Sequence, residues 1–231
     1  MSACTCTGSK IFRLASALAI VAAVGSLAVA QNSTTKAQAR AADTTTAKTA
    51  PKSDPYPLAT CPVSGRPLGD KPVIMEIDGR EYRFCCNDCP EKFKADPAKY
   101  IPAIDKAIVE QQKAFYPLTH CVVMTEDELV EGEAVDYVYN NRLVRFCCKG
   151  CIKKFNQDPK AFLAKLDAAV VEAQLATYPI DVCVISGEKL GGMGEPVNMV
   201  VNNRLVRLCC KGCEKSVRKD PAAALAKLEK K

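Results

Sequence analysis

The chain has 231 residues, of which 48% are hydrophobic and 25% charged, as in an ordinary globular protein. Its net charge of +6 is small, and it has no run of lysine and arginine with interleaved aromatic residues. Both features argue against a nucleic-acid partner and favour charges on solvated helix faces. The unusual feature is the content of 14 cysteines, in a chain with one histidine and no tryptophan.

Residues 1–30 have the three parts of an export signal. Lys10 and Arg13 precede a continuous run of apolar or small residues, 14–29, and an A-x-A cleavage site ends at residue 30. An uncleaved membrane anchor is the alternative, but the run is short and alanine-rich for a membrane span. We therefore expect cleavage, a periplasmic or extracellular location, and no stable membrane insertion of the mature chain.

Residues 31–55 consist mainly of threonine, alanine, lysine, glutamine and serine, without a large apolar side chain. Such a segment cannot bury enough surface to fold, so it is predicted to be a disordered linker. Cys4 and Cys6 would be removed with the export signal. The remaining cysteines all lie beyond the linker.

Three repeats fill the rest of the chain, at residues 56–115, 116–177 and 178–231. Each begins with Tyr-Pro, continues with one isolated cysteine and a Cys-Cys-x-x-Cys cluster, and has an Asp-Pro pair after the cluster. The cluster recurs every 62 residues, and self-similarity at a fixed period indicates tandem modules. The cysteines of the three repeats are Cys61, Cys85, Cys86 and Cys89; Cys121, Cys147, Cys148 and Cys151; and Cys183, Cys209, Cys210 and Cys213.

The same elements are predicted in every repeat. In the first, strands at residues 73–77 and 81–84 flank a turn at residues 78–80; Asn-Asn pairs stand at the later turns. Because these turn residues tolerate positive φ, tight hairpins are expected. A short helix, 86–95, ends at an Asp-Pro pair, where a second helix with an apolar face begins. The predicted fold class is therefore α+β, with three tandem small modules.

Modules of about sixty residues with few large apolar side chains commonly need disulfides, a metal or neighbouring modules for stability. Cys86 and Cys89 are three residues apart on the short helix and share a face, and Cys85 stands at the strand end beside them. A hairpin followed by a helix start, with one more cysteine from an upstream turn, is a common arrangement of small zinc sites. Three thiolates per module can meet in this way, and this pattern does not identify a fourth ligand.

The first repeat carries Cys61-Pro62-Val63-Ser64-Gly65 before the hairpin, Tyr82-Arg83-Phe84-Cys85-Cys86-x-x-Cys89 at its end, and then Phe93 and Asp96-Pro97-x-x-Tyr100. With these residues the chain resembles the YHS and TRASH domains, and the resemblance covers residues 56–231 in three copies. It implies treble-clef-like modules and a role in heavy-metal trafficking, resistance or sensing. The family pattern of one cysteine followed by C-x-x-x-C falls on Cys61, Cys85 and Cys89; Cys121, Cys147 and Cys151; and Cys183, Cys209 and Cys213.

Two departures from this pattern leave the ligand set open. Related zinc modules often have a second cysteine in the upstream turn, where this chain has Ser64, Met124 and Ser186. The middle cysteine of each cluster is an addition to the pattern, and it either completes the site or reacts. These additional residues are Cys86, Cys148 and Cys210.

The thiols have three alternative uses. Metal binding suits the spacing, with Cu(I) at a three-thiolate site or Zn²⁺ at a four-thiolate site, one ion per repeat. Disulfides suit an exported protein, and four cysteines per repeat allow two bridges, although the adjacent Cys85 and Cys86 would need different partners. Redox catalysis would favour a thioredoxin-like background, which this chain lacks.

The sequence thus predicts an exported protein that binds, sequesters or transfers thiophilic metal, with all cysteines of the repeats as candidate ligands. It has no Ser/His/Asp set and no glycine-rich phosphate loop, so an enzyme is not expected. The alternative is a disulfide-stabilised module without metal that binds another exported protein. His120, Met124, Met193 and Met199 are further candidates as copper ligands, but single residues of these types are more often packing or surface residues.

Overall fold

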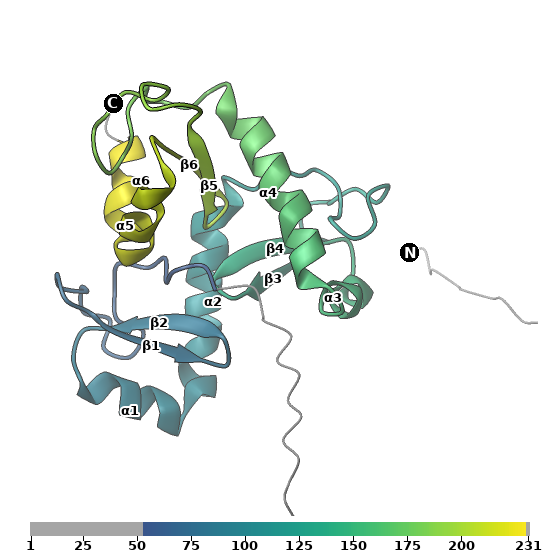
Figure 1. Ribbon diagram of the computed structural model, residues 1–231. Helices are drawn as coiled ribbons and strands as arrows, with labels where there is room; N and C mark the ends of the chain where they lie inside the picture. Colours follow the sequence, from purple (N-terminus) through teal and green to yellow (C-terminus); the bar gives the residue numbers. More distant parts are fainter. Residues whose placement is uncertain (1–52, 230–231) are drawn as a thin grey trace, which may run out of the picture. The chain divides into compact units, whose positions relative to one another are not determined.

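The computed structural model describes residues 53–229 (Figure 1). The expected export signal, residues 1–30, and residues 31–52 of the expected linker lie outside this described part. Within it, each repeat has a two-stranded antiparallel hairpin followed by helices, which confirms the predicted α+β fold. No helix in residues 53–229 combines the length and the hydropathy of a membrane span.

We refer to the three repeats as the first, second and third module. The first module contains β1 (Val73–Ile77), β2 (Arg80–Phe84), α1 (Asp88–Ala95) and α2 (Pro97–Lys113). The second module contains β3 (Val135–Tyr139), β4 (Arg142–Phe146), α3 (Lys149–Phe155) and α4 (Pro159–Leu175). The third module contains β5 (Val197–Val201), β6 (Arg204–Leu208), the 3₁₀ helix η1 (Lys211–Cys213), α5 (Glu214–Lys219) and α6 (Pro221–Glu229).

Each hairpin closes through a two-residue turn in the left-handed backbone region. The φ angles are 51° at Asp78 and 77° at Gly79, and the Asn-Asn turns of the other modules have φ between 47° and 69°. The sequence pattern placed Arg80 in the turn, whereas in the structure it is the first residue of β2 and pairs with Ile77. This short turn fixes the register, so that β2 ends where the cysteine cluster begins.

The Asp-Pro pairs start the second helix of their modules, as predicted. Asp96 accepts a hydrogen bond from the backbone amide of Lys99 at 3.3 Å, with a proline in the first turn. Asp158 and Asp220 cap their helices in the same way, at 3.3 and 3.0 Å. The last helix, α6, has 9 residues against 17 in α2 and α4, so the third module is the shortest, as expected.

Every module has a small core between its hairpin and its helices. Phe84 and Phe93 are fully buried in the first module, and Phe146 and Phe155 in the second. Their ring centroids are 5.6 and 5.4 Å apart, in edge-to-face contact. In the third module Val217 takes the place of the second aromatic residue and is equally buried. These contacts fix the strand end against the short helix, the two elements that carry the cysteine cluster.

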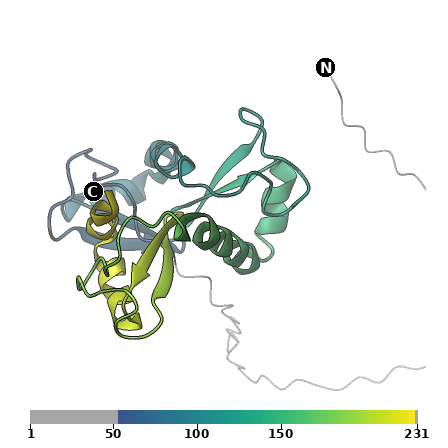
Figure 2. The ribbon, with the colours of Figure 1, turned by 90° about the horizontal axis from the view of Figure 1, so that it is seen from above.

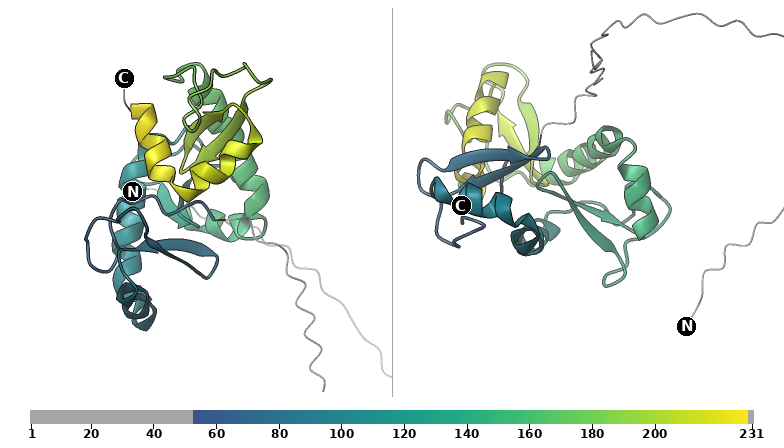
Figure 3. Two further views of the ribbon diagram at one scale, coloured as in Figure 1. Left: turned by 60° about the vertical axis from the view of Figure 1, so that its left-hand side comes forward. Right: turned by 90° about the horizontal axis from the view of Figure 1, so that it is seen from below.

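The long helix of each of the first two modules packs on the hairpin of the next module. Helix α2 contacts β3 and β4, and α4 contacts β5 and β6; Figure 2 shows α4 between the second and third modules. The third module returns to the first, because α5 lies beside β2 (Figures 1 and 3). There the Arg83 guanidinium donates to the carbonyl oxygens of Arg218 and Lys219, each at 3.1 Å.

A buried glutamine joins all three modules. Gln112 in α2 is 1% exposed, and its Nε2 donates to the carbonyl oxygen of Asn141 at 2.8 Å. Its Oε1 accepts from the backbone amide of Leu143 at 2.8 Å and from Nδ2 of Asn203 at 3.2 Å. Asn141 also accepts from the Arg80 guanidinium at 2.8 Å. All of these hydrogen bonds join residues of different modules. The asparagines that close the hairpin turns therefore also connect the modules.

The end of the expected linker also contacts the second module. The backbone amide of Asp54 donates to the carbonyl oxygen of Asn140 at 3.1 Å, and the Ser53 hydroxyl donates to the same oxygen at 3.2 Å. The Asp54 carboxylate lies 4.0 Å from the guanidinium of Arg142. Burial raises the pKa of Asp54, and Arg142 opposes this shift. The chain is therefore held against the hairpin turn before the first module begins.

Candidate metal centre

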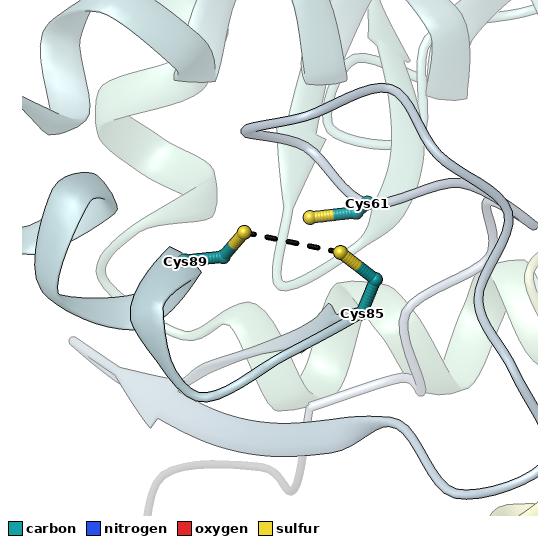
Figure 4. A group of neighbouring side chains, drawn as sticks. All are labelled: Cys61, Cys85 and Cys89. Carbon is teal, nitrogen blue, oxygen red and sulfur yellow. Dashed lines mark hydrogen bonds between the residues drawn. The ribbon is translucent and has the colours of Figure 1, made fainter.

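Three cysteine sulfurs converge in each module (Figure 4). Cys61 comes from the loop before β1, Cys85 follows β2 directly, and Cys89 lies in the first turn of α1. Their sulfur atoms all lie within 4.8 Å of one another. We call such a group a triad; the three triads are Cys61, Cys85 and Cys89; Cys121, Cys147 and Cys151; and Cys183, Cys209 and Cys213.

A tight loop holds the first cysteine of each triad, and we call it the knuckle loop (residues 61–66, 121–127 and 183–188). In the first module the amide of Cys61 donates to the Arg66 carbonyl at 2.8 Å, and the amide of Gly65 donates to the Cys61 carbonyl at 2.9 Å. Gly65 has φ of 69°, a conformation that glycine adopts without strain. The second knuckle loop is one residue longer and closes on the Asp127 carbonyl without a glycine.

An oxygen atom from the knuckle loop contacts the second thiol of every triad. The Ser64 hydroxyl lies 3.2 Å from Cys85, and the corresponding serine of the third module lies 3.4 Å from Cys209. In the second module the Cys147 thiol donates to the carboxylate of Asp127 at 3.2 Å. Each triad therefore has three sulfurs and one oxygen at its edge. Sequence reasoning missed Asp127, and the extra residue in its loop was the available signal.

The middle cysteines lie beside the triads and outside them. Their sulfurs contact the last cysteine of the same cluster, at 3.3, 3.8 and 4.0 Å in the first, second and third modules. None of the middle cysteines is buried: Cys148 is exposed, and Cys86 and Cys210 are half-buried, as are the triad members Cys85, Cys147 and Cys213. The structure thus brings nine of the predicted ligands together in three triads and leaves Cys86, Cys148 and Cys210 at the side.

The triads favour a thiolate on the knuckle-loop cysteine. Burial alone raises the pKa of Cys61, but hydrogen bonds from the Ser64 hydroxyl and from nearby backbone amides outweigh it, and the pKa falls to about 6. The same balance of burial against hydrogen bonds lowers the pKa of Cys183 to about 6. It also lowers the pKa of Cys121, mainly through the backbone amide of Met124.

The last cysteine of each triad keeps its proton instead. Burial and the hydrogen bonds with Cys86 and Cys61 raise the pKa of Cys89 to about 12. Burial is also the main reason why the pKa rises to about 11 at Cys151 and to about 12 at Cys213. Without a metal, the first and third triads therefore have both an anionic and a protonated thiol at neutral pH, as expected for sulfurs that share one negative charge.

The sulfur spacing suits a bound metal ion. Thiolates bound at about 2.3 Å around a tetrahedral centre lie about 3.8 Å apart. The sulfurs of the second and last triad cysteines are separated by 3.9, 3.7 and 3.8 Å in the three modules. All twelve cysteines in residues 53–229 are free thiols. The triads are therefore shaped to hold a metal ion with little rearrangement.

The other candidate ligands make contacts of other kinds. His120 is exposed, and its Nδ1 bonds to the adjacent Thr119 hydroxyl at 2.9 Å. The sulfur of Met124 lies 3.5 Å from the ammonium of Lys154. Met193 is 68% exposed, and Met199 is packed in the core of the third module. Among the described residues, no group that could hold a metal ion includes His120.

Comparisons with known proteins give no match, so a function must be inferred from the geometry of the triads. No protein-family model, no curated protein and no solved structure matches the chain. The structure itself establishes three modules of one α+β fold and three cysteine triads positioned to hold a metal ion.

Proposed function

We propose that this chain is an exported metal-binding protein that holds one thiophilic ion in each triad and sequesters or transfers it. The observation that carries the proposal is the threefold repetition of one sulfur site. In every copy the second and last sulfurs are 3.7–3.9 Å apart, and all three lie within 4.8 Å of one another. An isolated group of cysteines has many explanations, but three copies with the same spacing and no disulfide among the described residues favour a common ligand.

The donor set favours soft metals. Cys61, Cys85 and Cys89 would hold the ion in the first module, and their counterparts would do so in the others. Three thiolates satisfy Cu(I), whereas Zn²⁺ needs a fourth donor, for which the oxygen beside each triad is placed. Zn²⁺ is best served in the second module, because a carboxylate is a common zinc ligand and a serine hydroxyl is not.

Two sequence features and one structural feature support export and a role in metal sequestration or transfer. Residues 1–30 have the form of an export signal, which would place the sites outside the cytoplasm. The resemblance to YHS and TRASH domains supports a role in metal trafficking or resistance and a binding function rather than catalysis. The third support is structural, since the modules are joined by buried hydrogen bonds and the triads are therefore fixed in one framework.

Cobalt titration tests the metal site directly, because thiolate-bound Co²⁺ absorbs strongly in the near ultraviolet. Reduced protein should bind three equivalents. Cys61→Ser should lose one of them, and Cys86→Ser, the matched control from the same module, should lose none. Competition with a Cu(I) chelator and with a Zn²⁺ chelator then ranks the two metals. A triple Cys61→Ser, Cys121→Ser, Cys183→Ser variant that still binds three equivalents would contradict the proposal.

A further inference from the structure

Each triad lies next to one thiol that it does not use. The Cys86 sulfur is 3.3 Å from that of Cys89, and the corresponding distances are 3.8 and 4.0 Å in the other modules. A disulfide has a sulfur–sulfur distance of about 2.05 Å, so the first pair needs an approach of only about 1.3 Å. Rotation of the half-buried Cys86 side chain, two residues before α1, supplies such a movement without a change of the fold.

The accessibility of the thiols decides which of them meets an oxidant first. Cys86 is half-buried, whereas Cys61 and Cys89 are 1% and 4% exposed. Cys85 is adjacent to Cys86 in the chain, and a bridge between neighbouring residues is strained. Cys89 is therefore the natural partner of Cys86, and it is also a member of the triad.

We infer that the middle and last cysteines of each module form a reversible disulfide that competes with the metal ion. The pairs are Cys86 with Cys89, Cys148 with Cys151, and Cys210 with Cys213. The competition rests on the proposed function, since a last cysteine that is oxidised no longer offers a thiolate to the triad. The pairing itself rests on the short sulfur distance in the first module, 3.3 Å, and on accessibility in the other two. There Cys148 is exposed and Cys147 half-buried, and Cys210 is half-buried and Cys209 buried.

The oxidant is a disulfide such as glutathione disulfide. The Cys86 thiolate attacks one of its sulfurs, which forms a mixed disulfide and releases one glutathione thiolate. The Cys89 thiol then gives its proton to solvent, and its sulfur attacks Cys86, which forms the intramolecular bridge and releases the second glutathione thiolate. Two electrons have moved from the cysteine pair to the glutathione disulfide. A metal ion in the triad has lost one of its three sulfur ligands.

The charge beside the site differs between the modules. Arg66, Asp127 and Glu188 occupy the same place in the knuckle loop, because the carbonyl of each accepts the amide of the triad's first cysteine at 2.8 Å. The Arg66 guanidinium lies 3.9 Å from the Cys86 sulfur. Glutathione disulfide is anionic, so Arg66 attracts it, although Asp88 and Glu91 lie in the first turn of α1. In the other modules Lys149 and Lys211, which follow the middle cysteines, offset Asp127 and Glu188. The sulfurs of the pair are closest in the first module, at 3.3 Å. The first module is therefore oxidised first.

Disulfide mapping of reduced, metal-free protein tests the pairing. The protein is equilibrated with graded ratios of glutathione and glutathione disulfide, alkylated and analysed by peptide mass spectrometry. We expect three bridges, one in each module. Cys86→Ser should lose the first bridge, whereas the neighbouring Cys85→Ser should keep it. Bridges from Cys61 or Cys85 in the unaltered protein, or a Cys86→Ser variant with all three bridges, would overturn the inference.

Zinc release tests the competition. Glutathione disulfide should release Zn²⁺ from loaded protein, as read with a chromophoric chelator, and release should slow at least about tenfold in a triple Cys86→Ser, Cys148→Ser, Cys210→Ser variant. An unchanged rate in that variant would overturn the competition. Failure of the reduced protein to bind Zn²⁺ or Cu(I) would contradict the proposed function instead, and the map of the metal-free protein still decides the pairing.

Bridge formation rates in the three modules test the order of oxidation, and charge substitutions test the contribution of the knuckle-loop residue. Arg66→Glu should slow bridge formation in the first module, and Glu188→Arg should speed it in the third. The second module, unaltered in both variants, is the internal control. Added salt should reduce the effects of both substitutions. Equal rates in all three modules of the unaltered protein would overturn the proposed order.

Discussion

Replacing Gln112 with alanine tests whether buried hydrogen bonds hold the modules together. The substitution removes three hydrogen bonds and leaves three groups without this partner: the Asn141 carbonyl, the Leu143 amide and one hydrogen of the Asn203 side chain. A buried polar group without a partner destabilises the fold by about 1–3 kcal/mol. A cavity of about 190 Å³ borders Gln112, and water entering there restores part of the bonding. We therefore expect a loss of about 3 kcal/mol in the free energy of unfolding.

The neighbouring Gln111 supplies the matched control. It lies on the same helix and is exposed, so Gln111→Ala should change the free energy of unfolding by less than about 0.5 kcal/mol. Gln174, the partly buried counterpart of Gln112 in α4, accepts from the Leu205 amide at 2.8 Å and donates to the Asn203 carbonyl at 2.9 Å. Gln174→Ala should give an intermediate loss.

Urea unfolding of the reduced protein in the presence of a chelator, followed by circular dichroism, measures these differences. The chelator removes any contribution of bound metal to stability. If Gln112→Ala and Gln111→Ala unfold with the same free energy, the buried network does not hold the modules. A second, separate transition in Gln112→Ala alone would support the network, because it would show a module that unfolds independently.

Further predictions concern the sites and a helix cap. Because Cys89 and Cys213 hold their protons up to pH about 12, bound Zn²⁺ must displace protons. Its apparent affinity should rise from pH 6.5 to 7.5 and fall on acidification, as measured by chelator competition; a pH-independent affinity would contradict this. The pKa of Cys147 is raised by burial and by its hydrogen bond to Asp127, so Asp127→Asn should lower it. Timed alkylation should then show faster labelling of Cys147 with the other modules unchanged, and an unchanged rate at Cys147 would contradict the role of that bond. Asp158→Ala removes a helix cap and should destabilise the protein by about 1 kcal/mol in the same urea assay; no loss would show that the cap adds nothing.

Local patterns predicted most of each module. The turn residues predicted the hairpins, and the strand at residues 73–77 has the expected bounds. The Asp-Pro pairs predicted the start of each second helix. This signal is local, because the capping side chain and the proline are adjacent in the chain. The predicted short helix, 86–95, begins two residues later, at Asp88, so Cys86 precedes α1 while Cys89 lies in its first turn; their sulfurs are nevertheless 3.3 Å apart.

The contacts between modules escaped prediction because they join residues far apart in the chain. Asn141 fits its hairpin turn as a local residue, and nothing near it indicates that it also accepts from Arg80, 61 residues earlier. The available signal was the recurrence of Arg80, Arg142 and Arg204, and of Gln112 and Gln174, at the repeat period. The apolar core of a module does not require these polar residues. Their recurrence at the repeat period therefore indicates that they make contacts between modules.

The composition of the triads required tertiary structure. Sequence spacing groups Cys86 and Cys89, but the position of Cys61 decides which thiols surround a common point. The knuckle loop brings Cys61 toward Cys85 and leaves Cys86 on the accessible side. Asp127 was missed because the later repeats have the same distance of 26 residues from the lone cysteine to the cluster, which hides the longer second knuckle loop.

Native mass spectrometry of protein purified without oxygen tests the central claim most directly. The account predicts about three metal ions per chain, their loss to a chelator with the appearance of free thiols, and two ions in a Cys61→Ser variant. Protein isolated directly from its compartment with six disulfides and no metal would contradict it.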